Sequence, residues 1–176
     1  VKGNIYGHSG GHFGVGCEWR VYQKEGYTVV LLTNRDADNG FLDARFYIQR
    51  LLAGSTASID TYFFTKEVIE TCIEYGYAKA IELIKTSKVD LSENAINTKG
   101  YELLRLGKTE LAIDVFKLEA FAFPQSHYSF DSLGEAYMKN GNIDLAILNY
   151  QKSLELNPEN ENAREMINKM RASNIP

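Results

Sequence analysis

The sequence predicts an α+β chain, in which a small three-stranded antiparallel sheet with one helix precedes an all-α solenoid of helical hairpins. Three observations predict it. Apolar residues alternate with polar residues or glycine near the N-terminus, and a 34-residue pattern of small residues and prolines recurs in the second half. Nine of the 14 glycines also fall between the N-terminus and Gly54, so the composition changes there. A length of 176 residues leaves room for one ordinary domain or two small ones.

The charge balance argues against a nucleic-acid partner. Nineteen Lys and Arg residues stand against 23 Asp and Glu residues, which gives a net charge of −4, and no basic run could neutralise a line of phosphates. No apolar stretch approaches the roughly 20 residues that cross a bilayer, so we expect no membrane span. Two cysteines, Cys17 and Cys72, are too few for a disulfide framework and wrongly spaced for zinc, so we expect two buried thiols.

The glycine-rich first region predicts three antiparallel strands and a helix within residues 1–54. Residues 4–8 look extended, and a Lys-Glu-Gly turn at 24–26 leads into residues 27–33, which are apolar on both faces, as in a strand covered on both sides. Apolar residues then recur at helical spacing from about 40 to 53. Between the first two segments, period-two alternation predicts a strand with one apolar face, formed by Phe13, Val15, Cys17, Trp19 and Val21.

This sheet unit is too small to be complete by itself. A strand that is apolar on both faces needs cover on both sides, and one helix supplies only one. The second region, another copy of the chain or the rest of a larger domain could cover the open face. The chain begins at Val1 without an initiator methionine, so we expect a processed protein or an excised piece.

The second region repeats itself with a constant offset. When residues 93–126 are placed on residues 127–160, small residues, turn glycines and prolines coincide, and each unit reads as helix, turn, helix, proline. We expect close helix approach at the first glycine of each unit, a left-handed turn at the second, and capping of the following helices by Thr109 and Asn142. The coincident pairs are Gly100 with Gly134, Gly107 with Gly141, Ala112 with Ala146, Phe116 with Tyr150, and Pro124 with Pro158.

This pattern resembles the tetratricopeptide repeat, which implies a solenoid of helical hairpins. Residues 55–64 are then a linker, and residues 65–176 a tetratricopeptide-repeat domain. A degenerate hairpin over 62–88 precedes the repeats 93–126 and 127–160, and a capping helix over 160–171 follows them.

The sharpest short motif is Tyr-Gly-His-Ser-Gly-Gly at residues 6–11. By itself it is equally typical of a tight turn between strands, with His8 and Ser9 exposed. Together with the strands and helix that follow, residues 1 to about 53 resemble the C-terminal end of the β-lactamase-like serine hydrolases, which include class C β-lactamases, penicillin-binding proteins and related esterases. The resemblance implies that His8, Ser9 and Gly10 are the third motif of that family, that His8 positions the substrate, and that the Gly11 backbone N–H is an oxyanion-hole donor.

The remaining catalytic residues of that family are absent from this chain. No serine has a lysine three residues later, and the Ser-Glu-Asn at 92–94 matches the family's second motif only at a helix start, where Ser92 is better explained as an N-cap. We therefore expect a C-terminal fragment of a larger hydrolase, inactive alone. The resemblance implies that the parent is a β-lactamase, esterase or peptidase of a bacterial periplasm or cell envelope. We expect no cofactor and no metal, since His12 and His127 have no evident ligand partners.

Tetratricopeptide arrays bind peptides on the concave face that the first helix of each hairpin lines. The lining here is mixed and partly acidic and lacks a Lys and Arg set that would clamp a C-terminal carboxylate, so a polar or basic segment fits better. The alternative is that the repeats are a packing or self-association element, with the groove filled by residues 54–64 or by the hydrolase domain. By family position the peptide-binding residues are Asn97, Tyr101, Leu104, Arg105, Tyr128, Asp131, Glu135 and Met138.

Overall fold

The computed structural model of the protein describes residues 5–12, 15–23, 26–33, 44, 48, 52 and 57–173. The chain divides into two compact units, Val1–Ile59 and Asp60–Pro176. The first contains an antiparallel sheet and the second a series of helices, so the α+β class is confirmed. Among the described residues, no helix is both long enough and apolar enough to cross a membrane.

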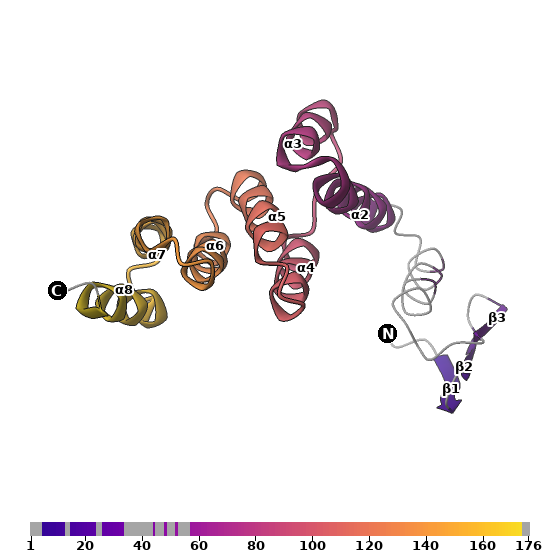
Figure 1. Ribbon diagram of the computed structural model, residues 1–176. Helices are drawn as coiled ribbons and strands as arrows, with labels where there is room; N and C mark the ends of the chain where they lie inside the picture. The colour runs from indigo at the N-terminus through magenta and orange to yellow at the C-terminus, as the bar shows by residue number, and fades with distance from the viewer. Residues whose placement is uncertain are drawn as a thin grey trace. The chain divides into compact units, whose positions relative to one another are not determined.

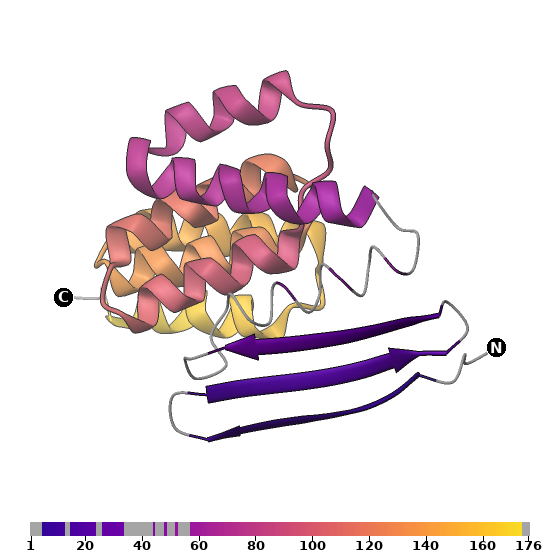
Figure 2. The same ribbon diagram turned by 90° about the vertical axis from the view of Figure 1, so that its right-hand side faces the viewer.

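The first unit holds the three predicted strands, β1 (Ile5–His12), β2 (Val15–Tyr22) and β3 (Tyr27–Thr33). Both pairs are antiparallel in the order β1-β2-β3, as Figure 2 shows. In this register His8 lies opposite Trp19, and Trp19 lies opposite Val30. The Tyr-Gly-His-Ser-Gly-Gly motif thus lies inside β1, and the interpretation of these glycines as a tight turn is wrong.

The buried face of the sheet is not the face that the alternation predicted to be apolar. Glu18 and Tyr22 on β2 are 3% and 5% exposed, whereas Trp19 on the expected apolar face is 44% exposed. On β3, Val30 and Leu32 are also exposed, so the expectation of a strand covered on both faces is wrong. Alternation separates two faces of a strand, but the neighbouring elements decide which face is covered. On the buried face, Arg20 forms an ion pair with Glu18, which supplies a partner for the charge of Glu18.

The two cysteines differ in their surroundings. Cys72 is buried, as expected, and its burial raises the pKa of the thiol to about 12. Cys17 is exposed, because it shares the uncovered sheet face with Trp19, so the prediction of a buried thiol there is wrong.

Little of the predicted helix at residues 40–53 falls among the described residues. Ala44, Ile48 and Leu52 are helical and recur at every fourth position, with Ile48 and Leu52 half-buried and Ala44 exposed. The rest of that segment lies outside the described residues.

The second unit consists of helices, of which α4 to α8 each pack against the next along the chain and α3 packs against α5 (Figure 1). Residues 57–64, which include most of the expected linker, form the start of the first of these helices, so the prediction of a linker there is wrong for this part. The helices are α2 (Ala57–Tyr75), α3 (Tyr77–Thr86), α4 (Glu93–Arg105), α5 (Thr109–Ala122), α6 (His127–Lys139), α7 (Ile143–Leu156) and α8 (Glu161–Ser173).

Close approach within each hairpin occurs at the glycines that the offset identified. A Cβ atom on Gly100 would overlap the ring of Phe116, and one on Gly134 would lie 3.1 Å from the ring of Tyr150. Phe116 and Tyr150 are almost completely buried and occupy equivalent positions in the two repeats. Each hairpin is thus closed by an aromatic ring of the second helix against a glycine of the first.

The turns between paired helices use backbone groups rather than capping side chains. Gly107 and Gly141 have φ angles of 71° and 80°, in the left-handed region where glycine carries no steric cost. The backbone N–H of Asn142 donates to the carbonyl of Tyr137 at 2.9 Å, as in a Schellman motif. Neither predicted N-cap forms: Thr109 is the first residue of α5, and Asn142 makes no side-chain capping bond. The preceding glycine already sets the turn.

Two hydrophobic cores hold the described helices together. The first contains buried residues of α2 to α6 and is centred on Phe116 and Leu118 of α5. The second joins α7 to α8 through Tyr150, Ile167 and Met170. The faces of α4 and α6 that do not contribute to these cores remain available for a site.

Candidate functional site

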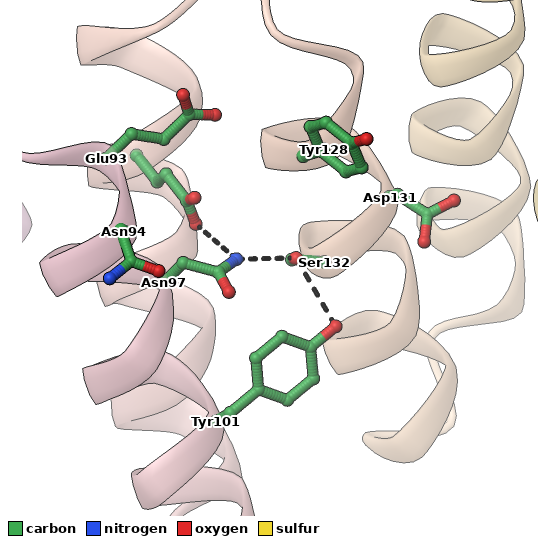
Figure 3. A pocket seen from close by; sticks show the side chains of 8 residues that line it. Glu93, Asn94, Asn97, Tyr101, Tyr128, Asp131 and Ser132 are labelled. Atoms are coloured by element: carbon green, nitrogen blue, oxygen red, sulfur yellow. Dashed lines mark hydrogen bonds between the residues drawn. The ribbon is translucent and has the colours of Figure 1, made fainter.

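An open cavity of about 340 Å³ lies between α4 and α6, with α5 contributing to its lining. Figure 3 shows Asn97 and Tyr101 of α4 and Ser132 of α6 directed into the space between the two helices, while the carboxylate of Asp131 points away from α4. The sequence makes both helices amphipathic, with apolar residues directed to the cores and polar residues left on the other side. The lining residues are Glu93, Asn94, Asn97, Tyr101, Glu119, Tyr128, Asp131 and Ser132.

A chain of hydrogen bonds crosses this cavity from α4 to α6 (Figure 3). Asn97 donates from Nδ2 to Oγ of Ser132 at 2.8 Å, and Ser132 donates to the hydroxyl of Tyr101 at 3.3 Å. The Tyr101 hydroxyl in turn donates to Oε2 of Glu135 at 3.0 Å, and Lys139 forms an ion pair with Oε1 of the same carboxylate at 2.8 Å. These bonds fix the directions of the polar side chains before any ligand arrives.

Burial raises the pKa of the Tyr101 hydroxyl, which is already protonated at neutral pH at its ordinary value. Desolvation is the largest influence and raises the pKa of Tyr101 to about 12, while the hydrogen bond to Ser132 acts in the opposite direction. Tyr101 therefore remains a donor to Glu135.

Glu119 on α5 is the least accommodated polar side chain of the cavity. The residue is 0% exposed, its Oε2 accepts a hydrogen bond from Nδ2 of Asn97 at 3.3 Å, and its Oε1 has no hydrogen-bond partner among the described residues. Burial raises the pKa of this carboxyl to about 8, the hydrogen bond from Asn97 lowers it, and the charge of Glu93 raises it. The carboxyl is therefore mostly protonated at neutral pH.

The second repeat also has an acid in this region, Asp131, and neighbouring side chains supply its hydrogen-bond partners. Asp131 occupies the position in the second repeat that Asn97 has in the first, and its two carboxylate oxygens accept hydrogen bonds from Asn160 at 2.8 Å and Asn162 at 3.0 Å. Asn160 also donates to Ser153, the equivalent of Glu119, at 2.8 Å. Burial raises the pKa of Asp131, and the two asparagine bonds act against that rise. Here the chain supplies every partner that the acid needs.

The structure brings together half of the residues predicted for the groove. Asn97, Tyr101, Tyr128 and Asp131 line the cavity. Glu135 is not a lining residue, but it accepts a hydrogen bond from Tyr101 of the lining. The other three lie elsewhere: Leu104 and Met138 are half-buried against the two cores, and Arg105 is exposed in the last turn of α4.

Four lining residues were not predicted from the sequence: Glu93, Asn94, Glu119 and Ser132. Glu119 escaped because it lies on the second helix of its hairpin, whereas the prediction used only first helices. One signal could have found it, since an acid there interrupts an otherwise apolar stripe that includes Val115, Phe116 and Leu118.

The described part of the expected linker does not fill this cavity. Residues 57–64 belong to α2, and none of them is among the lining residues. That alternative for the groove is therefore not supported by the described residues.

The predicted catalytic residues His8, Ser9, Gly10 and Gly11 all lie on β1. His8, Ser9 and Gly10 are exposed. Over the residues that the structure describes, no group of three or more His, Cys, Asp or Glu side chains could hold a metal ion.

Comparison with known proteins finds a family match that covers part of α6 and all of α7. Residues 132–160 match the tetratricopeptide repeat family, and no curated protein matches the chain. The family match lies within the helices, so the hydrolase resemblance of residues 1 to about 53 stays a prediction.

Several solved structures are similar to the chain at low identity. They include the first tetratricopeptide domain of Spaghetti (RPAP3) bound to the HSP90 peptide SRMEEVD, at 19% identity and a TM-score of 0.48, covering 66% of this chain and 94% of that one. A crystal structure of MamA has 21% identity and a TM-score of 0.48, covering 73% and 75%. The second tetratricopeptide domain of human RPAP3, in complex with an HSP70 peptide, has 18% identity and a TM-score of 0.47, covering 65% and 98%. The family match at residues 132–160 falls within the repeat that the 34-residue offset predicted at 127–160.

Proposed function

We propose that the helical unit is a protein-interaction module and that the cavity between α4 and α6 receives a polypeptide segment of a partner. The observation that carries this proposal is the set of polar side chains from three helices that converges on one open cavity and is held in place by hydrogen bonds. Preorganised polar groups lower the cost of ordering a site when a ligand binds. Peptide capture is also the usual task of helical-hairpin arrays.

The charge of the cavity favours a polar or basic segment. Its lining includes three acids, Glu93, Glu119 and Asp131, and no Lys or Arg. The HSP90 peptide SRMEEVD, which the similar Spaghetti domain binds, ends in acidic residues and a carboxylate. Such a tail would place like charges together here, and like-charge juxtaposition disfavours binding. We therefore expect this chain to reject acidic tails.

Selection from a random peptide library displayed on phage, with the whole chain as bait, tests the proposal. Charge reversal by Asp131→Lys together with Glu135→Lys should weaken binding of the selected peptides by about tenfold or more, because Asp131 lines the cavity and Glu135 is bonded to Tyr101 of the lining. The matched control is Glu155→Lys on α7, where Glu155 is exposed and pairs with Lys152. Equal binding by the double variant and the control would contradict the groove assignment, as would a selection that returns no binding peptide.

A second proposal concerns residues 1–54, which we assign to the terminal piece of a β-lactamase-like serine hydrolase domain. The motif on β1 supports it, and so does the uncovered sheet face that exposes Trp19, Val30 and Leu32. In this proposal His8, Ser9 and Gly10 are the third motif, Gly11 supplies an oxyanion-hole N–H, and the chain alone has no nucleophile.

The test of the second proposal uses a longer protein that contains this chain. It should carry a Ser-x-x-Lys motif upstream of Val1, hydrolyse a chromogenic ester or β-lactam, and lose that activity on His8→Ala. A longer protein without the motif would end the proposal.

A further inference from the structure

The acidic cavity, defined by Glu93, Glu119 and Asp131 with Tyr128, contains a hydrogen-bonding group for which the described residues supply no partner. Oε1 of Glu119 has no partner among the described side chains, although the residue is completely buried. A buried carboxyl oxygen without a partner costs free energy, because it has lost the water that would otherwise solvate it. The packing of α4, α5 and α6 maintains this cost in the empty protein.

The second repeat shows which donor is missing. There, Asn160 reaches both Asp131 and Ser153, each at 2.8 Å. The equivalent of Asn160 in the first repeat is Ser126, whose short side chain makes no capping bond. The first repeat thus has an acid, Glu119, where the second has Ser153, and it has Ser126 where the second has the amide donor Asn160. Among the described residues, none supplies a hydrogen-bond partner for Oε1 of Glu119.

The residues around Glu119 favour a cationic group as its hydrogen-bond partner. Glu93 on α4 and Asp131 on α6 bring further carboxyls to the same cavity, and no Lys or Arg lies among the lining residues. Tyr128 is 66% exposed and also lines the cavity, and the face of an aromatic ring attracts cations. A neutral partner would meet the hydrogen bond but would not balance the acids of the lining.

We propose that the acidic cavity binds the cationic side chain of an arginine or lysine in the partner segment, with Glu119 as its buried counter-ion. This inference rests on the proposed peptide-binding function and names the side chain that the groove selects. The volume of about 340 Å³ is large enough to admit one long side chain.

Cation binding at this place is coupled to release of a proton. The empty cavity holds Glu119 mostly protonated at neutral pH, because burial raises its pKa to about 8. A bound cation favours the ionised form, so affinity should rise by up to about tenfold per pH unit between pH 6 and 8 and level off above that range.

Other groups near the cavity titrate and must be separated from Glu119. Helices α3, α4 and α6 pack against α5. Glu93 and Tyr101 lie on α4, and Tyr128 and Asp131 lie on α6, while α3 contributes no residue to the lining. His127 begins α6, where its Nε2 lies 3.3 Å from Nδ2 of Asn157 and its charge acts on Asp131. A His127→Gln background therefore removes the histidine whose charge acts on this acid.

The experiment titrates the whole ¹⁵N-labelled chain with short capped peptides, observed by NMR. The probes share the sequence Ser-Gly-x-Gly-Ser, with arginine, lysine or citrulline at x, since citrulline has the shape of arginine without its charge. The arginine and lysine probes should shift the amide signals of α4 and α6, with affinity about tenfold or more above that of citrulline. Equal shifts with citrulline would overturn the proposal.

Two variants with the same substitution, one at the cavity and one away from it, locate the effect. Glu119→Gln should lower affinity for the arginine probe by about tenfold or more and remove the pH dependence, whereas Glu155→Gln on α7 should leave both unchanged. Circular dichroism establishes that each variant is folded. If Glu119→Gln binds as the control does, or if the pH dependence persists in it on the His127→Gln background, Glu119 is not the counter-ion and the inference is wrong.

The outcomes also separate this inference from the proposed function. Library peptides that bind the groove without any basic residue would leave peptide binding intact and overturn the cation site. An arginine probe that binds at Glu119, in a protein from which the library selects nothing, would support the cation site and overturn peptide capture.

Discussion

Gly100 and Gly134 occupy equivalent positions in two hairpins, yet they leave different amounts of space. A Cβ on Gly100 would overlap the buried ring of Phe116, whereas one on Gly134 would meet the ring of Tyr150 at 3.1 Å. We expect Gly100→Ala to lower the free energy of unfolding by about 2 kcal/mol, because overpacking exceeds the roughly 1 kcal/mol gain in helix propensity. Gly134→Ala should stay within about 1 kcal/mol of the wild type, since its smaller overlap and the same gain nearly cancel.

Urea unfolding followed at 222 nm measures both glycine variants. The two substitutions add the same methyl group on the same kind of helix, so each is the control for the other. Equal destabilisation would contradict the closer approach at Gly100.

The buried carboxyl of Glu119 makes stability depend on pH. Its pKa rises from 4.5 to about 8 on folding, so between these values the native state holds a proton that the unfolded state has lost. This contribution to stability is complete below pH 4.5, declines as the pH rises, and is constant again above about 8. We expect the stability of Glu119→Gln relative to wild type to increase by a few kcal/mol from pH 5 to pH 9.

Urea midpoints of the two proteins at each pH give this difference, in which groups common to both, such as Asp131, cancel. A difference that does not change with pH would show that the carboxyl of Glu119 is ionised in the native state. The same substitution thus links stability to the cation site.

Individual site residues were predictable only where the repeat position determines their direction. Asn97 and Tyr128 face the cavity because they lie on first helices at concave positions. Glu119 could not be placed in this way, since the lining by α5 depends on how far α4 and α6 separate, and the repeat period does not specify that distance. Leu104 shows the opposite error, because its side chain packs against the first core.

At the scale of an element, the starts of α4 and α6 offer a matched pair of serines. Ser92 accepts a hydrogen bond from the backbone N–H of Ala95 at 3.3 Å, while Ser126, its equivalent in the next repeat, makes no side-chain capping bond. Loss of an N-cap costs about 1 kcal/mol. We expect Ser92→Ala to lower the unfolding free energy by about that amount and Ser126→Ala to change it by less than half as much, as measured by urea unfolding. A larger loss of stability for Ser126→Ala than for Ser92→Ala would show that the N-cap bond had been assigned to the wrong serine.

The type and order of the elements followed from the sequence, whereas some of their limits and faces did not. Alternation and the repeat offset predicted the strands and hairpins, because each reflects a backbone period. The start of α2 at Ala57 was missed, since the aromatic pair Tyr62 and Phe63 in a polar context gave no helical periodicity. These rings pack edge to face at 5.3 Å within the helix. An open face of the sheet was predicted, but which face is buried was predicted wrongly, because that depends on contacts distant in sequence.

For the whole molecule, the division into two units was visible in the composition and is sharper in the structure. The glycine content changes near Gly54, and the boundary between the two compact units lies in the sequence between Ile59 and Asp60. Both helical cores consist only of residues from α2 to α8 and the turns between them. A unit with its own core can unfold by itself. The chain should therefore show two transitions.

The single tryptophan allows these transitions to be separated, because Trp19 lies on β2 and reports only on the first unit, while ellipticity at 222 nm reports mainly on the helices. Gly100→Ala should lower the thermal midpoint seen at 222 nm and leave that of Trp19 emission unchanged. Gly7→Ala should do the reverse, since a Cβ on Gly7 would overlap the backbone of β2 at Trp19. If either variant shifts both midpoints equally, the units unfold as one, because each signal then responds to damage in the other unit.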